Sequence, residues 1–329
     1  MAIESELDSL AKPLAADSPC GASLEDTQLL ASFDAYHLFG QTMQLQETDW
    51  RALKAASLEA LAQSKDFRLL THFAAASLRI DGWAGFLGSI RVAAGWIKEH
   101  WGAVYPLVDE DAILRKNALS CLADRMAIID GVRRTPIVEN KQLGRYALRD
   151  IELASGKLTP TETDTTVPTE SEITAALTAS PLEELQPLEQ SFAAAIADIQ
   201  TIDSAMREYG GAAASPDVDA LMDALGALRK ILREQLELRG AADAAAAESG
   251  EAAEGGAGKA VGGIKSRQDA IRAIDTIAAY FRQNEPSSPV PVFLDRAKNL
   301  VGKSFLEILK DVAPEGVAGA KLAGGIKDE

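Results

Sequence analysis

The sequence predicts a mainly α-helical protein of several domains, and three observations lead to that prediction. Apolar residues from Trp83 to Trp101 advance mostly by three or four positions, which is the spacing of an amphipathic helix. Two stretches, 157–169 and 240–266, are rich in Thr, Pro and acidic residues or in Ala and Gly, a composition typical of linkers. Helical spacing recurs outside these stretches, so helical domains are expected on either side of each.

The composition narrows the classes of function. The chain has 329 residues, of which 47% are hydrophobic, as in ordinary globular proteins. Its formal net charge of −16 repels nucleic acid and anionic membrane surfaces, so neither is an expected partner. The N-terminus lacks the apolar core of a signal peptide, and no apolar run approaches the roughly twenty residues of a membrane span. With Cys20 and Cys121 interpreted as free thiols, the expected location is the cytoplasm, without membrane insertion.

The first predicted domain, residues 1–156, is an ordered loop followed by stacked antiparallel helices. Pro13, Pro19 and Gly21 interrupt regular structure near its start. Apolar spacing then predicts a helix from Trp50, with Thr48 and Asp49 as caps, followed by helices over Phe67–Leu78, Trp83–Trp101 and about Ala112–Asp130. Within 135–154, the segments Pro136–Asn140 and Tyr146–Ala154 mix β-branched and polar residues, which predicts two short strands.

The predicted middle domain, residues 170–239, is a set of helices that ends in a helical hairpin. Thr169 and Glu172 have the spacing of a capping box, so a helix is expected from Glu170 to just before Pro181. The next helix carries an apolar stripe and ends at Gly210-Gly211. A last helix is expected with Ser215 as its N-cap and Pro216 at its first position. The short loop between these two helices predicts an antiparallel hairpin.

The C-terminal part is predicted to be a flexible linker (240–266), a small helical module (267–316) and a disordered tail (317–329). A module of about fifty residues hides only around 60% of the surface that its unfolded chain exposes. Its apolar residues are therefore expected to form a homo-oligomer interface, with a self-contained three-helix domain as the alternative. The oligomerisation candidates are Ile271, Ile274, Ile277, Phe281, Val290, Val292, Phe293, Leu294, Leu300, Val301, Phe305, Leu306, Ile308 and Leu309.

The candidate motifs for catalysis, cofactor binding and metal binding do not have the residue spacing that such sites require. Gly302-Lys303-Ser304 and Gly258-Lys259 lack the glycine that a phosphate-binding loop needs five positions earlier, where the chain has Ala297 and Ala253. Helix capping is the favoured explanation of Gly302 and Ser304. His37, His72 and His100 have no second histidine at metal-binding spacing, and no nucleophile-elbow motif is present. The sequence therefore predicts no catalytic, cofactor-binding or metal-binding residues and no enzyme.

Several motifs resemble a known family. The segment Ser18–Gly21 (SPCG), the Trp50–Leu53 helix start, Ser64–Leu69 (SKDFRL) and Leu78–Phe86 (LRIDGWAGF) are similar to the ImpA-type N-terminal domain of TssA proteins from bacterial type VI secretion systems. The segment Glu285–Gly316 is similar to the C-terminal end of the shorter TssA members. The middle region shares only its helical character with the family.

The resemblance implies a cytoplasmic structural subunit rather than an enzyme. Members of the family assemble into rings through their C-terminal regions, and they contact baseplate, membrane-complex, inner-tube and sheath proteins during tail assembly. Short members resemble baseplate-associated components, which is the type expected here. Two alternatives remain at this point: a monomeric helical adaptor unrelated to secretion, and a nucleotide-dependent regulator that uses Gly302–Ser304 or scattered carboxylates.

Overall fold

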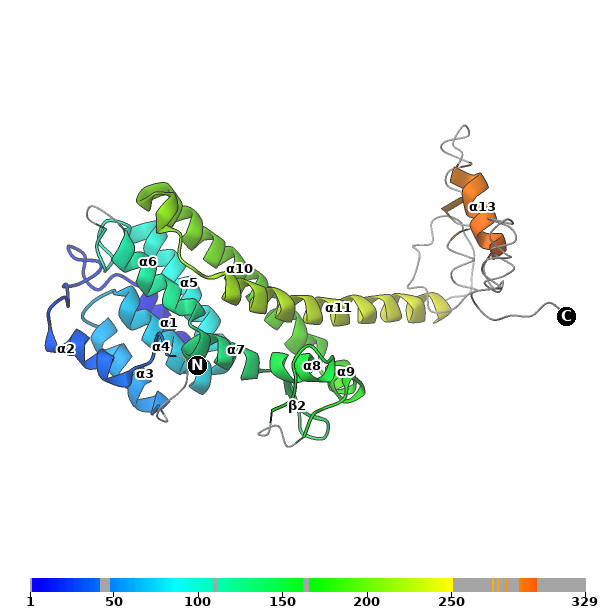
Figure 1. Cartoon of the computed structure of the whole chain (residues 1–329), viewed down its shortest axis with the longest axis horizontal. Coiled ribbons are helices and arrows are strands. Elements are labelled where there is room, and N and C mark those ends of the chain that lie inside the picture. The colour runs from blue at the N-terminus through cyan, green and yellow to red at the C-terminus, as the bar shows by residue number, and fades with distance from the viewer. Residues whose placement is uncertain are drawn as a thin grey trace, which may run out of the picture. The chain divides into compact units, whose positions relative to one another are not determined.

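The computed structural model describes residues 2–41, 48–108, 112–161, 166–250, 274, 277–278, 282 and 290–300 (Figure 1). The chain divides into two compact units, Met1–Arg239 (unit 1) and Gly240–Glu329 (unit 2). Helices dominate the described residues, which contain a single two-stranded sheet. The predicted mainly α fold is confirmed.

The first part of unit 1 is a bundle built around two buried helices. Its helices are α1 (Ala2–Ala11), the short α2 (Gln28–Ala31), α3 (Trp50–Leu61), α4 (Phe67–Ile80) and α5 (Gly82–His100). In α4 ten of the fourteen residues are buried, because α3 and α5 cover it on two sides (Figure 1). Asp49 caps α3 by accepting hydrogen bonds from the Arg51 and Ala52 amides, as its position in the sequence predicted. Gly82, at φ +64°, makes the predicted break between α4 and α5.

The helix predicted over Ala112–Asp130 is interrupted. The structure has α6 (Ile113–Ser120), a short 3-10 turn, a π-helical turn over Arg125–Ile129 and α7 (Asp130–Arg134). Asp124 causes the break, because its backbone is extended and its carboxylate accepts hydrogen bonds from the Met126 and Ala127 amides. Asp124 therefore acts as the N-cap of a new helical segment.

A β-hairpin follows α7, and only part of the predicted second strand belongs to it. Strand β1 (Pro136–Asn140) pairs antiparallel with β2 (Gly144–Ala147). Beyond Ala147 the strand prediction is wrong, because Leu148–Ala154 forms helix α8. The Asp150 carboxylate accepts a hydrogen bond from the Ala147 amide at 2.8 Å, which satisfies a backbone donor at the start of this helix.

The helices of the middle region are α9 (Glu170–Ala179), α10 (Leu182–Gly210) and α11 (Asp219–Gly250). The capping box is confirmed, since Thr169 Oγ1 accepts from the Glu172 amide and the Glu172 carboxylate accepts from the Thr169 amide. The predicted start of the last helix at Ser215-Pro216 is wrong. The Ser215 hydroxyl donates to the Asp203 carboxylate, and α11 begins at Asp219.

Unit 1 joins segments that the sequence assigned to separate domains, 1–156 and 170–239. Helix α10 packs along α5, and α9 packs against β1 (Figure 1). The junction is apolar, because Phe192 of α10 is fully buried against Trp83 of α5. The boundary of unit 1 falls at Gly240, where the linker was predicted to begin, although α11 continues to Gly250. Residues 251–266 and 317–329 lie outside the described residues.

Candidate functional site

The predicted oligomerisation residues that the structure describes lie in unit 2, in or near α13 (Val290–Leu300). Phe293 is 68% exposed, which makes it the most exposed large apolar side chain among the described residues. Ile277 is 41% exposed, and Ile274, Val290 and Leu294 are half-buried. The remaining oligomerisation candidates lie outside the described residues or have no described side chain. They are Ile271, Phe281, Val292, Leu300, Val301, Phe305, Leu306, Ile308 and Leu309.

An ion pair and a small buried side chain accompany α13. Arg282 Nη2 lies 2.5 Å from the Asp295 carboxylate, so the ion pair ties α13 to the chain that precedes it. Ala278 is completely buried, whereas Ile277 beside it is exposed. One side of this chain therefore packs within unit 2, while Phe293 and Ile277 present apolar surface to solvent.

The family motifs of unit 1 come together inside the protein. The segment around Ser64–Asp66 lies between two other chain segments, because the Lys65 amide donates to the Cys20 carbonyl and the Tyr105 amide donates to the Lys65 carbonyl. Gly21 has φ +72°, and a Cβ atom there would lie 2.1 Å from the Gln63 carbonyl oxygen. Only a glycine at position 21 therefore lets the SPCG segment lie this close to the chain at Gln63.

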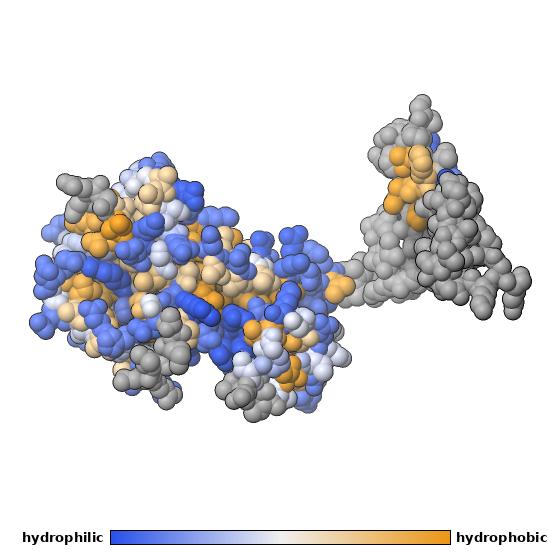
Figure 2. All heavy atoms as spheres, in the orientation of Figure 1, coloured by the Kyte–Doolittle hydropathy of each residue, from blue (hydrophilic) through white to orange (hydrophobic). Residues whose placement is uncertain are grey.

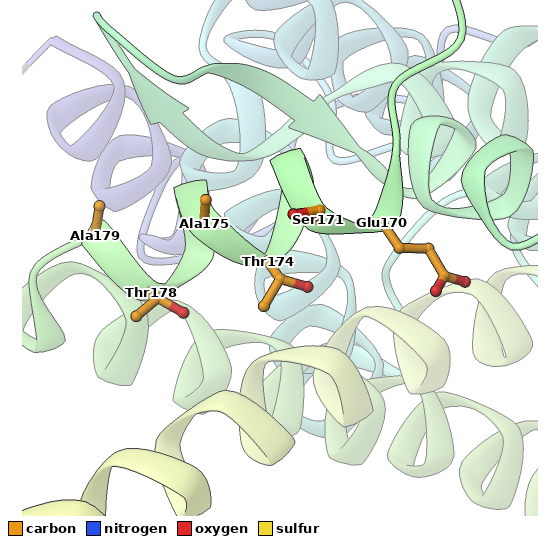
Figure 3. Close-up of a pocket in the computed structure, with 6 residues that line it drawn as sticks. All are labelled: Glu170, Ser171, Thr174, Ala175, Thr178 and Ala179. Carbon is orange, nitrogen blue, oxygen red and sulfur yellow. The ribbon is translucent and has the colours of Figure 1, made fainter.

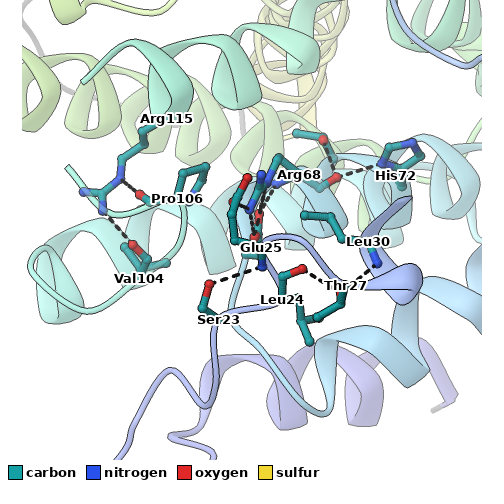
Figure 4. A network of polar contacts seen from close by, with 12 residues as sticks. Ser23, Leu24, Glu25, Thr27, Leu30, Arg68, His72, Val104, Pro106 and Arg115 are labelled. Carbon is teal, nitrogen blue, oxygen red and sulfur yellow. Dashed lines mark hydrogen bonds and ion pairs between the residues drawn. The ribbon is translucent and has the colours of Figure 1, made fainter. Parts of the chain in front are cut away.

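Arg68 of the SKDFRL segment lies at the centre of a polar network (Figure 4), and Asp66 of the same segment is one of its partners. The fully buried Asp66 carboxylate caps α4 at the Arg68 amide and also accepts from the Arg68 guanidinium at 2.7 Å. Arg68 reaches Glu25 at 2.7 Å as well. Burial by itself would lower the pKa of Arg68, but hydrogen bonds to Asp66 and Glu25 outweigh it and raise the pKa. The network joins the N-terminal loop to α4.

Two buried cations hold backbone segments in place. Lys65 Nζ donates to the Leu10 carbonyl at 2.5 Å and lies 4.7 Å from the centre of the Trp96 ring. Burial lowers the pKa of Lys65 to about 8. Arg115 donates to the Val104 and Pro106 carbonyls at 2.6 and 2.9 Å (Figure 4), and also to the Trp101 carbonyl at 3.0 Å. Burial lowers the pKa of Arg115 to about 10, so it stays charged near neutral pH.

The burial of Arg115 was not predicted from the sequence, and Lys65 was noted only as part of the SKDFRL segment. For Arg115 a signal existed, because its spacing to Ala118 and Leu122 places a cation on the apolar face of α6. A cation at such a position becomes buried only where unpaired carbonyls surround it. These contacts show that the motif residues build the frame of unit 1.

The cysteine and histidine side chains do not form a metal site among the described residues. Cys20 and Cys121 are free thiols, and burial raises the pKa of both, that of Cys121 to about 11. His72 is half-buried and packs edge to face against the rings of Phe33 and Phe39. No group of three or more His, Cys, Asp or Glu side chains that could hold a metal occurs in the described part of the chain. Gly258, Lys259 and Gly302–Ser304 lie outside it.

Two hollows on the described surface of unit 1 do not bring several unpaired charges together in a ligand site. A shallow depression is lined by one face of α9, whose described side chains are mostly small, such as Ala175 and Ala179 (Figure 3). A second hollow, of about 370 Å³, lies between α10 and α11. Its cations are already engaged, for example Arg229 with Glu189 at 2.8 Å. Among the described helices, none is long and apolar enough to span a bilayer.

Comparisons with known proteins agree with the motifs. Residues 11–124 match the family described as ImpA, N-terminal, type VI secretion system. The fold of unit 1 resembles the N-terminal domain, including the conserved ImpA_N region, of the TssA component from Burkholderia cenocepacia, with a TM-score of 0.55 and 21% identity over 70% of this chain and 92% of that one. Unit 1 thus resembles an ImpA-type N-terminal domain both in the sequence of residues 11–124 and in its fold.

The similarity also extends beyond that domain. The chain is 27% identical over 342 residues to type VI secretion system component TssA1 from Pseudomonas aeruginosa, and this alignment covers 95% of this chain and 96% of the relative. The resemblance to TssA proteins that the sequence predicted is confirmed. The chain is therefore similar to a type VI secretion system component over nearly the whole length of both proteins.

Proposed function

We propose that this chain is a structural assembly component of a type VI secretion system that acts in the cytoplasm and catalyses no reaction. In this proposal the C-terminal module, 267–316, forms a homo-oligomeric ring. The copies of unit 1 then bind baseplate, membrane-complex, inner-tube and sheath proteins during tail assembly. The alignment with TssA1 over 95% of this chain and 96% of the relative is the observation that carries the proposal.

The exposed apolar residues of unit 2 support an oligomeric module. Phe293 and Ile277 present 68% and 41% of their surface to solvent on a helical segment too short to build a large core. Burial between copies would stabilise the oligomer by roughly 1.5 to 3 kcal/mol for each large apolar side chain that becomes fully buried. A ring would also convert weak single contacts of unit 1 into multivalent binding at high effective concentration.

The proposal is tested by measuring the mass of the full-length chain with multi-angle light scattering. The unmutated chain is expected to form a multimer, and Phe293→Asp is expected to reduce its mass because the charge cannot be buried without a partner. Leu306→Asp is expected to act in the same way. Leu238→Asp is the matched control, because Leu238 is also exposed, at 57%, but belongs to unit 1.

Two results would contradict the proposal. One is a monomeric unmutated chain at micromolar concentration, which would favour the monomeric helical adaptor. The other is saturable binding of ATP or GTP in calorimetry, which would favour the nucleotide-dependent regulator. Far-UV circular dichroism of Phe293→Asp must show unchanged helix content, so that a loss of mass is not caused by unfolding.

A further inference from the structure

Helix α1 lies at the surface of the N-terminal bundle, where it packs on α5. Among its described residues Leu10 alone is buried, while Ile3, Glu6 and Leu7 are half-buried and the rest are exposed. Hydrophilic residues cover much of the visible surface of unit 1, with hydrophobic residues between them (Figure 2). The outer side of α1 is polar in the same way. α1 is thus a peripheral helix that contacts unit 1 through one face, and we call the surface beneath it the α1 seat.

Two features of the α1 seat match particular side chains of α1. A Cβ atom on Gly88 of α5 would lie 2.2 Å from Leu7 Cδ1, and the three atoms nearest to it all belong to Leu7. The missing side chain of Gly88 therefore leaves a notch that Leu7 fills. Lys54 of α3 pairs with Glu6 at 2.6 Å, and its second partner, Asp81 at 2.8 Å, holds the ammonium in place.

The α1 seat also binds the carboxyl end of the helix. Lys65 Nζ and Trp96 Nε1 both donate to the Leu10 carbonyl, at 2.5 and 2.9 Å. The last carbonyls of a helix have no partner within the helix, and a cation near them complements the helix dipole. The seat therefore recognises a helix with apolar residues at positions 3, 7 and 10, an acidic residue at position 6 and an unpaired carbonyl in its last turn.

The chain that follows α1 lets the helix reach a seat other than its own. Residues 12–18 are exposed except for Leu14. When extended, these seven residues span at most about 25 Å. A helix of ten residues is marginal by itself in water, so α1 depends on a seat for its stability. Because only one of its described side chains is fully buried, few contacts have to break when α1 leaves.

The occupant that matches the seat in every feature is α1 itself, and each copy of the chain carries one. An α1 from a second copy would make the same contacts with Gly88, Lys54 and Lys65, so an exchange changes only the path of residues 12–18. Exchange of an identical element between copies is a low-cost route to association. We propose that the α1 seat of one copy accepts α1 of another copy, so that neighbouring copies of unit 1 exchange their N-terminal helices. This inference rests on the proposed homo-oligomer, which raises the local concentration of seats.

Disulfide trapping tests the exchange on full-length chains. One copy carries Leu7→Cys and the other carries Gly88→Cys. A Cβ atom at position 88 would lie 3.2 Å from Leu7 Cγ, which brings the two cysteines within reach of a disulfide. The variants are mixed under mild oxidation, and the cross-linked dimer is measured on a non-reducing gel.

Ser5→Cys replaces Leu7→Cys in the matched control, because Ser5 lies on the exposed side of α1. Cys20 and Cys121 are present in every sample, so the control and each variant alone measure their background. The mixture of Leu7→Cys and Gly88→Cys is expected to give at least about tenfold more cross-linked dimer than the control, because the disulfide geometry is met only in the seat.

Two results would overturn the proposal. If the mixture gives no more dimer than the Ser5→Cys control, while the double variant Leu7→Cys/Gly88→Cys closes its disulfide within one chain, α1 stays in its own copy. If the double variant keeps its free thiols, Leu7 does not lie at Gly88 and the seat is not formed. Light scattering tests the ring separately, so a failure of the exchange and a failure of ring formation are distinguishable. Circular dichroism checks that each variant keeps its helix content.

Discussion

The Phe192 ring meets the Trp83 ring edge to face, with centroids 4.8 Å apart and planes at 81°. Phe192 belongs to α10 and is fully buried, whereas Trp83 lies in the first turn of α5. Trp83 Nε1 also donates to the Pro136 carbonyl at 2.7 Å, at the start of β1. One aromatic contact thus joins the N-terminal bundle, the hairpin and the long helices. Unit 1 should therefore unfold as a single cooperative body.

Phe192→Ala is predicted to lower the free energy of unfolding of unit 1 by about 3 to 5 kcal/mol, the usual cost of removing a buried Phe side chain. Urea unfolding of the full chain is followed by tryptophan fluorescence and by far-UV circular dichroism. All four tryptophans precede residue 102, so fluorescence reports only on the N-terminal bundle. Because the contact joins both parts, the two midpoints are expected to fall together.

Leu238→Ala is the control for this experiment, because Leu238 is 57% exposed and its truncation should change stability little. A fluorescence midpoint that stays in place while the circular dichroism midpoint falls would contradict the single cooperative body. It would show that the segments 1–156 and 170–239 unfold separately.

Thr169→Ala is predicted to cost about 1 kcal/mol, because it removes the side-chain oxygen that accepts from the Glu172 amide. Thr174 is the matched control, since it lies on the exposed face of α9 and caps nothing. Thr174→Ala should leave stability unchanged or raise it slightly through helix propensity. Thermal unfolding compares the two variants. Equal losses of stability in the two variants would show that the capping box does not stabilise α9.

The sequence allowed those elements to be predicted whose signals are local. Asp49 and Thr169 cap helices through neighbouring amides, and Gly82 supplies a left-handed turn, so each acts within a few residues. The union of 1–156 with 170–239 could not be predicted in this way. It depends on the contact between Trp83 and Phe192, which are far apart in the sequence and each look like ordinary core residues.

Exposed apolar residues could be predicted only in part, for a similar reason. Apolar spacing made Phe293 and Ile277 candidates for an oligomer interface, and both are exposed in the structure. The exposure of Ile113 and Leu114, at 55% and 56%, was missed because their position suggests the start of a buried helical stripe. The bonds from Arg115 to three carbonyls of the preceding chain were missed as well, because no periodic pattern signals them.

Asp66→Ala is predicted to destabilise unit 1 by about 3 to 5 kcal/mol, because it leaves the half-buried Arg68 without its buried partner and removes the cap of α4. The matched control is Glu25→Ala, which removes the other partner of Arg68. The Glu25 side chain is 52% exposed, so its loss should cost less than about 1 kcal/mol. Urea unfolding by circular dichroism measures both variants. If Glu25→Ala lowers the free energy of unfolding as much as Asp66→Ala does, the buried Asp66 carboxylate contributes no more to stability than the exposed Glu25 carboxylate.

The buried ammonium of Lys65 predicts that stability depends on pH in the alkaline range. Burial lowers the pKa of Lys65 from 10.5 to about 8 in the folded chain, while its contact with the Leu10 carbonyl does not restore the ordinary value. Between these two pH values the unfolded chain binds more protons than the folded chain. The free energy of unfolding contributed by Lys65 therefore rises with pH across this window, by up to about 3 kcal/mol, and is constant below pH 8.

Lys65→Met keeps most of the side-chain volume and removes the titration, so the variant should lack this rise. Urea unfolding is measured from about pH 7 to about pH 10.5, and the difference between the variant and the unmutated chain isolates Lys65. The difference is needed because the raised pKa values of Cys20 and Cys121 act in the opposite direction: the unfolded chain loses the thiol protons first, so stability falls as pH rises. Lys98→Met is the matched control on the exposed surface of α5. If Lys65→Met and the unmutated chain show parallel pH curves, Lys65 titrates as it does in the unfolded chain, and its ammonium is not held in the interior of unit 1.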